Sequence, residues 1–254
     1  MENSKQQYTN YIHISKNESY LLNIIDKNKL IVFGVKELYR LCKCHKSSIY
    51  NTLFSLKEKG ILVKIKRNRY TLKKDLNERL FEIATSTVIP SYISFWTALS
   101  FYGFTEQQVR TVQLVSTKQE PKINFDSYHI EITTFNLKRF YGYKREGNFV
   151  IAEEEKALID SLFQPEKCGG FTEFLHCFEN ALDEINKKKF IDYLIQFNNR
   201  SMISRIGYIM EELGLPTENL KRYISKSYVK LNPIANKTNK YNRSWNVILN
   251  QEIK

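Results

Sequence analysis

Cationic side chains are concentrated in two neighbouring segments of the N-terminal third, and their spacing is typical of a surface that binds a polyanion. Residues 47–59 read as a helix, and residues 61–72 read as two short strands joined by a turn. Lys and Arg side chains neutralise phosphates regardless of base sequence. In and beside these segments they are Lys46, Lys57, Lys64, Lys66, Arg67 and Arg69, with Asn68 in the turn.

The same predicted helix also carries polar side chains of the kinds that read base edges. Its apolar stripe contains Ile49, Leu53 and Leu56, and we extend that stripe to Phe54. A helix that enters the major groove of DNA presents its polar face to the bases and phosphates. The side chains away from the stripe are Ser47, Ser48, Tyr50 and Asn51.

A second group of residues could perform metal-dependent chemistry. Glu153, Glu155 and Lys156 follow a predicted strand, as the carboxylates and lysine of a metal nuclease can, and Asp126 or Glu131 could supply a further ligand for Mg²⁺. Glutamates in the first turn of a helix are also favoured by the helix dipole alone. We therefore keep a metal-dependent nuclease only as a minor alternative.

The cysteines do not form a persuasive metal site. Cys42, Cys44 and His45 are close in sequence, but a zinc site needs four ligands, usually in two separated pairs. Cys168 and Cys177 are separated by eight residues in a helical context, so we expect reduced thiols, no metal and no cofactor. The sequence contains no P-loop and no G-x-S-x-G motif, and we expect a protein that is not an enzyme.

Charge is distributed unevenly along the 254 residues, whose net charge is +12. Residues 1–80 hold 17 Lys and Arg against 7 Asp and Glu, a net charge of +10. Residues 81–220 hold 14 against 19, a net charge of −5, and residues 221–254 hold 8 against 1, a net charge of +7. A basic module, a mildly acidic one and a basic tail are therefore expected, and the basic module predicts a nucleic-acid partner.

The elements around the cationic helix follow the order of a winged helix-turn-helix. Residues 1–17 are polar, and we expect them to be flexible. Residues 18–75 predict three helices followed by a basic hairpin, with Asn17 or Ser19 capping the first helix and Ser47 the third. Gly60 stands where a glycine often follows a helix, and residues 30–33 form a short β-prone run.

The rest of the chain, residues 80–254, predicts a larger α+β domain with the basic tail 221–254 at its end. Strands are expected early and helices late. One early amphipathic helix includes Ile93 and Trp96 and stops at Gly103. The other predicted helices cover 80–86, 155–163, 171–185, 187–197 and 200–213, and the strands cover 111–117, 128–135, 149–152 and 245–249.

Several of these stretches resemble one known family. They are the run 90–107 (PSYISFWTALSFYGFTEQ), the run 110–118 (RTVQLVSTK), the step Phe140-Tyr141-Gly142, and the run 151–160 (IAEEEKALID). Together they are similar to the AbiE-type antitoxins and transcriptional regulators of type IV toxin–antitoxin systems. An N-terminal winged helix-turn-helix is the arrangement of that family as well.

The resemblance implies a repressor that binds double-stranded DNA at inverted repeats in its own promoter, as a monomer or weak dimer acting cooperatively. It also implies an antitoxin domain that counteracts a nucleotidyltransferase-like toxin in phage abortive infection or element maintenance. The alternative is a solitary winged-helix regulator whose second domain senses a ligand or protein. The polar N-terminus and the lack of a long apolar run predict a cytoplasmic protein without a membrane partner.

Overall fold

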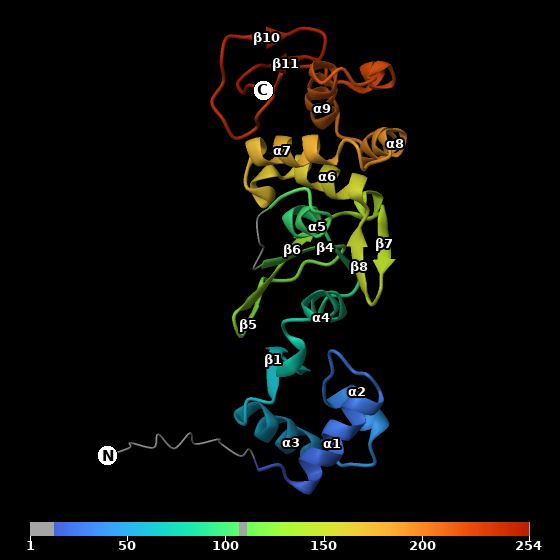
Figure 1. Ribbon diagram of the computed structural model, residues 1–254, viewed down its shortest axis with the longest axis vertical. Coiled ribbons are helices and arrows are strands. Elements are labelled where there is room, and N and C mark those ends of the chain that lie inside the picture. Colours follow the sequence, from blue (N-terminus) through green and yellow to red (C-terminus); the bar gives the residue numbers. More distant parts are fainter. Residues whose placement is uncertain (1–12, 107–110, 254) are drawn as a thin grey trace, which may run out of the picture. The chain divides into compact units, whose positions relative to one another are not determined.

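A computed structural model describes residues 13–106 and 111–253 of the chain. The chain divides into two compact units (Figure 1). The first comprises residues up to Thr87 together with 123–127, and the second comprises 88–122 and the residues from Tyr128 onward. Helix α4 (Leu80–Thr87), which we expected at the start of the larger domain, belongs to the first unit.

The first unit contains three helices followed by an antiparallel hairpin, in the predicted order. Leu21, Ile25, Leu38, Leu53 and Leu56 are buried together in a core that α1–α3 share with the hairpin. Gly60, with φ +69°, ends the third helix as expected. The elements are α1 (Lys16–Lys27), α2 (Val35–Leu41), α3 (Lys46–Glu58), β1 (Leu62–Lys66) and β2 (Arg69–Leu72).

The beginning of α1 differs from the sequence-based prediction. Its N-cap is Ser15, and not Asn17 or Ser19, because Ser15 and Glu18 form a capping box. The Glu18 amide donates to Ser15 Oγ (3.3 Å), and the Ser15 amide donates to the Glu18 carboxylate (2.6 Å). The flexible segment predicted over 1–17 is therefore too long, since residues 16–17 are helical; its first twelve residues lie outside the described ones.

Two expectations for α3 are also corrected. The helix begins one residue before Ser47, with His45 at the N-cap position and no side-chain cap. Phe54 is 64% exposed and does not belong to the buried stripe. The reason is the helical period, since Ile49, Leu53 and Leu56 already occupy the face toward α1 and α2, and Phe54 lies about 100° away from Leu53.

The second unit is mixed α and β, which confirms the α+β class. Three of its helices, α5, α7 and α8, contact α6. Central strand β3 pairs antiparallel with β4 and parallel with β8. The helices are α5 (Phe95–Phe101), α6 (Glu154–Phe163), α7 (Phe171–Ala181), α8 (Lys187–Phe197) and α9 (Arg200–Glu212). The strands of the sheet are β3 (Ser91–Ile93), β4 (Thr111–Ser116), β5 (Ile123–Phe125), β6 (Tyr128–Thr134), β7 (Tyr143–Glu146) and β8 (Phe149–Ala152), in the order β5-β6-β4-β3-β8-β7. All but β5, which is counted with the first unit, belong to the second unit.

The early helix of this unit is shorter than predicted because a strand precedes it. Ser91–Ile93 forms β3, and α5 begins only at Phe95. All three residues of β3 are buried, so the strand lacks the alternation that would distinguish it from a buried helical segment. The sequence also gave no sign of β5 or β7, which are only three and four residues long.

The basic tail packs back onto the second unit. Its short strands β9 (Val229–Lys230), β10 (Tyr241–Asn242) and β11 (Val247–Ile248) form a small sheet. Trp245 is fully buried beside Gly207 of α9, and its indole N–H donates to the Glu211 carboxylate (2.7 Å). Over the described part of the chain, no helix has the length and apolar character needed to span a bilayer.

Candidate nucleic-acid interface

Helix α3 exposes the residues that the sequence selected for base contacts. Ser47, Tyr50 and Asn51 are exposed, whereas Ser48 is half-buried. They lie opposite Ile49, Leu53 and Leu56, which are at most 1% exposed. The helix is thus held by one face and presents the other to solvent.

Glu18 fixes α3 to the start of α1. Its carboxylate accepts hydrogen bonds from Lys59 Nζ and from Ser55 Oγ, each at 2.7 Å. The hydrogen bond from Lys59, with those from Ser15 and Ser55, lowers the pKa of Glu18 to about 2. Glu18 therefore stays charged at neutral pH and ties the C-terminal end of α3 to the first turn of α1.

The cations of α3 differ in their surroundings. Lys46 is exposed, and its ammonium lies 5.0 Å from the centre of the Tyr39 ring, a cation–π contact that leaves its charge available to a phosphate. Lys57 pairs with its neighbour Glu58 at 2.8 Å, which offsets its charge locally. The N-terminal half of the helix is therefore the more cationic half.

The hairpin brings two further cations to the surface. Lys64 and Arg67 are exposed, and Lys66 is half-buried. β1 contacts α3, so these side chains and the α3 face belong to one unit. Of the hairpin cations selected from the sequence, Lys64 and Arg67 are thus the exposed ones.

Asn68 has a structural role that the sequence did not reveal. Its φ is +55°, in the left-handed region, and its Oδ1 accepts a hydrogen bond from the Val35 amide (3.0 Å). From the hairpin turn, the Asn68 side chain thus accepts a hydrogen bond from a free amide in the first turn of α2. The N-cap residue of α2, Gly34, has no side chain that could do so. A Cβ on Gly34 would lie 2.2 Å from the Asn68 carbonyl oxygen, so the glycine permits this approach.

Arg69 is also engaged within the unit. Its guanidinium bonds to the Glu37 carboxylate at 2.8 Å, with both side chains about one-third exposed. Burial alone would raise the pKa of Glu37, but the hydrogen bond from Arg69 and local backbone amides lower it overall. Arg69 and Asn68 thus position the hairpin against α2.

Two residues of the nuclease alternative share a cationic partner, since Lys189 Nζ lies 3.3 Å from the Glu153 carboxylate and 3.0 Å from that of Glu155. Glu153 accepts from the Tyr193 hydroxyl (2.5 Å), and Glu155 accepts from the Asn186 amide (2.9 Å). Lys156 is fully buried, and its ammonium pairs with Asp160.

The two further candidate ligands belong to different units, Asp126 to the first and Glu131 to the second. Glu131 pairs with Lys167 at 2.5 Å, while Asp126 lies in the turn after β5. Within residues 13–106 and 111–253, no three His, Cys, Asp or Glu side chains are placed to hold a metal ion.

The four thiols are free, and three of them are buried. Burial raises the pKa of Cys177 to about 12 and raises the pKa of Cys168 further. Burial, together with the neighbouring Cys44 thiol, also raises the pKa of Cys42. Protonated, buried thiols are poor metal ligands and nucleophiles.

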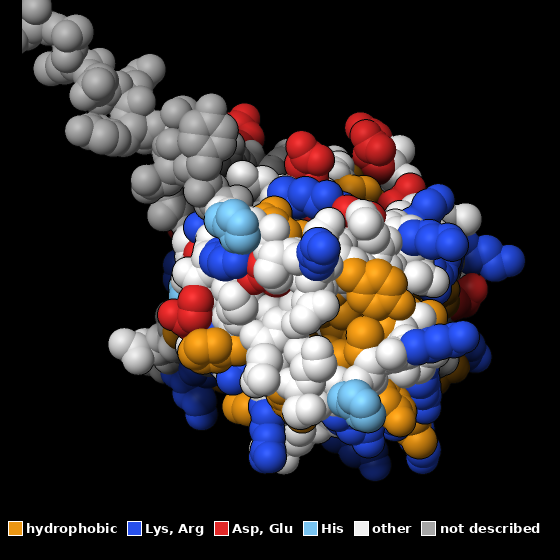
Figure 2. All heavy atoms as spheres, turned by 90° about the horizontal axis from the view of Figure 1, so that it is seen from below, with side chains coloured by type: hydrophobic (Ala, Val, Ile, Leu, Met, Phe, Trp, Pro, Cys, Tyr) orange, Lys and Arg blue, Asp and Glu red, His pale blue; other side chains and the backbone are white. Residues whose placement is uncertain are grey.

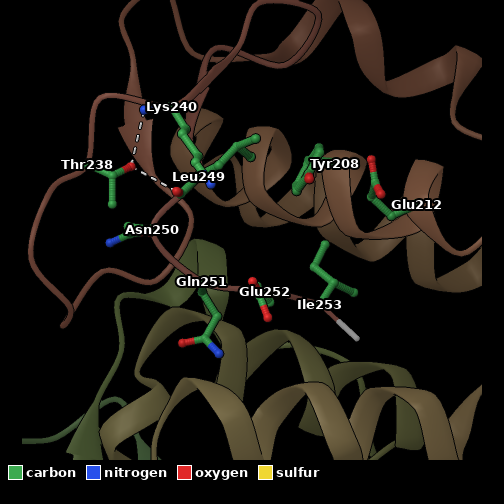
Figure 3. Close-up of a pocket in the computed structure, with 9 residues that line it drawn as sticks. All are labelled: Tyr208, Glu212, Thr238, Lys240, Leu249, Asn250, Gln251, Glu252 and Ile253. Atoms are coloured by element: carbon green, nitrogen blue, oxygen red, sulfur yellow. Dashed lines mark hydrogen bonds between the residues drawn. The ribbon is translucent and has the colours of Figure 1, made fainter.

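A hollow in the second unit lies between α9 and the end of the tail (Figure 3). Tyr208 and Glu212 come from α9, and the tail supplies the other lining residues. There the Thr238 hydroxyl donates to the Leu249 carbonyl oxygen (2.8 Å), which stabilises the tail itself. The lining from the tail is Thr238, Lys240, Leu249, Asn250, Gln251, Glu252 and Ile253.

Comparisons with known proteins reveal similarity in fold. No family model and no curated protein matches the chain. The crystal structure of the Rv2827c protein from Mycobacterium tuberculosis is similar over 93% of this chain and 92% of that one, with a TM-score of 0.66 and 11% sequence identity. At that identity the similarity shows a shared fold and nothing more specific.

Proposed function

We propose that the chain is a DNA-binding transcriptional repressor of its own promoter and the antitoxin of a type IV toxin–antitoxin system. The observation that carries the DNA-binding part is the exposed polar face of α3 beside exposed Lys64 and Arg67. These lie in a segment, residues 1–80, whose net charge is +10. A promoter target requires a cytoplasmic protein.

The arrangement suits a winged-helix mode of docking. α3 is long enough, at 13 residues, to lie in a major groove, and Ser47 and Asn51 present hydrogen-bonding groups toward base edges. Lys46, Lys64 and Arg67 would contact the phosphates on either side. Asn68 and Arg69 act indirectly in this proposal, by holding the hairpin in place.

DNA binding is tested with the segment immediately upstream of the coding region, in a gel-shift or anisotropy titration. The variant Lys64→Ala/Arg67→Ala removes two exposed cations of the hairpin. The matched control is Lys187→Ala/Lys188→Ala, which removes two exposed cations from α8 in the second unit. We expect weakened binding for the first variant only; equal affinities for both would reject this interface.

The antitoxin part is supported by the resemblance of the second unit to AbiE-type proteins, through the run 151–160 among others. It is tested by co-expression with a nucleotidyltransferase-like protein encoded next to this chain. From an unrelated promoter, Lys64→Ala/Arg67→Ala should restore growth as well as the unaltered chain does, because it leaves the second unit intact. No rescue by the unaltered chain, or no such neighbouring gene, would favour a solitary regulator.

A repressor that reads inverted repeats binds them in pairs. We therefore expect two copies of the chain, monomeric or weakly dimeric in solution, to bind the promoter cooperatively. A titration that fits independent sites would reject this part of the proposal alone.

A further inference from the structure

Two large aromatic side chains on α3, of the kind usually buried in a core, are exposed to solvent. Tyr50 is 52% exposed and Phe54 is 64% exposed, and they lie one helical turn apart on the same face. A largely exposed Phe on a helix gains little from the fold, so two exposed aromatic side chains one turn apart are a feature of binding surfaces.

The surroundings of this pair are cationic and polar. Within α3 the only acidic residue is Glu58, at the C-terminal end. Figure 2 shows the molecule from below, a face on which hydrophobic side chains lie among Lys and Arg side chains, with several Asp and Glu side chains toward its edge. An apolar centre with cations near its edge complements a DNA major groove, where phosphates flank the bases.

The major groove offers one apolar group, the C5-methyl of thymine. We propose that Phe54, with Tyr50 beside it, contacts thymine methyl groups and so makes the chain select A·T base pairs. Asn51, exposed and three residues before Phe54, has the side chain that pairs with adenine N6 and N7, so this part of the helix fits an A·T base pair. The inference rests on the proposed DNA-binding function and gives it a sequence preference.

A second protein is the competing occupant of an exposed aromatic pair. The net charge of the segment and the exposed Lys46 next to Tyr39 favour a polyanion. The polar groups of Ser47 and Asn51 would remain partly unpaired against an apolar protein surface, which is costly. DNA satisfies the charges, the polar groups and the rings together.

Thymine and uracil differ only by this methyl group, which gives a direct test. The upstream segment is amplified once with dTTP and once with dUTP, and both duplexes are titrated with the full chain. Burial of one methyl corresponds to roughly fourfold in affinity, so the uracil DNA should bind about fourfold more weakly for each methyl contacted.

The variants separate this effect from changes in DNA shape. Phe54→Ala should bind the thymine DNA more weakly and lose the difference between the two duplexes. Lys64→Ala/Arg67→Ala should bind both more weakly but keep their ratio. Because Phe54 is exposed, its replacement should leave the thermal unfolding temperature unchanged, which is checked by circular dichroism.

The other possible outcomes distinguish failure of the thymine contact from failure of DNA binding. Equal affinity of the unaltered chain for both duplexes, or the same ratio in Phe54→Ala, overturns the thymine contact while DNA binding stands. A change of oligomeric mass in Phe54→Ala with no change in the ratio identifies the pair as a protein interface. Failure of the unaltered chain to bind either duplex rejects the DNA-binding function itself.

Discussion

Lys156 and Asp160, one turn apart on α6, form an ion pair that is completely buried. The Asp160 carboxylate also accepts hydrogen bonds from Ser94 Oγ (2.7 Å) and from the Tyr92 hydroxyl (3.1 Å), and Lys156 donates to the Tyr92 hydroxyl (2.8 Å). The Lys156 ammonium lies 5.1–5.5 Å from the centres of four rings: Tyr92, Phe135, Tyr141 and Phe197. The pair therefore joins α6 to β3 and to the aromatic core.

Removing one member of this pair should be more damaging than removing both. Burial lowers the pKa of Lys156 and raises that of Asp160, so each charge depends on the other. Asp160→Asn leaves a buried ammonium unpaired and should lower the free energy of unfolding by about 3–5 kcal/mol. Lys156→Met/Asp160→Leu should cost less. Urea denaturation measures both, and a double variant less stable than Asp160→Asn would contradict this prediction.

The acid sensitivity of the first unit should depend on Glu18. Its folded pKa of about 2 lies below the ordinary value of 4.5, so its contribution to stability is complete above pH 4.5 and is lost as pH falls toward 2. Thermal melts of the unaltered chain and Glu18→Gln should therefore differ by a constant amount from pH 7 to pH 5. Below pH 4.5 the two melting temperatures should converge, and a constant difference at every pH would argue against this role.

Asn68 should matter for stability more than for DNA binding. Asn68→Gly keeps the left-handed backbone but loses the hydrogen bond to the Val35 amide, and should cost about 1 kcal/mol. Asn68→Ala loses the bond and also strains the backbone, and should cost about 1–2 kcal/mol more. The order of the two variants in chemical denaturation is the test, and an alanine variant as stable as the glycine variant would disprove the backbone argument.

The salt dependence of DNA affinity should show whether the two hairpin cations, Lys64 and Arg67, contact phosphates. If Lys64 and Arg67 each contact a phosphate, their replacement by alanine should reduce the slope of log affinity against log salt by about 1.8. The same titration on Lys187→Ala/Lys188→Ala should leave the slope unchanged. A reduction of the same size in the control would show that the effect is one of overall charge.

The effect of Gly207→Ala on the free energy of unfolding should depend on whether Trp245 is present. A Cβ at Gly207 would lie 2.0 Å from Trp245 Cζ3, so Gly207→Ala should destabilise the chain by about 1–3 kcal/mol. In the Trp245→Ala background the same change should be neutral or stabilising by up to about 1 kcal/mol, because alanine is the better helix residue. Equal costs in the two backgrounds, measured by urea denaturation, would exclude the steric explanation.

The sequence by itself determined the elements whose signals are local. The Ile49, Leu53 and Leu56 stripe fixed α3, the alternation of residues 61–66 fixed β1, and Gly60 fixed the end of a helix. It also determined where charge accumulates, because charge is additive along a chain. These features need no partner from elsewhere in the fold.

Tertiary structure decided the roles that depend on distant partners. Arg69 and Asn68 read as free hairpin side chains, yet Glu37 and the Val35 amide, more than 30 residues away, engage them. From the sequence, Lys156 was a candidate lysine of a metal nuclease, but in the fold it is buried and paired with Asp160 and Tyr92. Strand β3 is likewise buried along its whole length, so its sequence carries no alternating pattern. Burial and hydrogen bonding between remote segments leave no periodic trace in sequence, so only the folded chain shows which cations remain available to a partner.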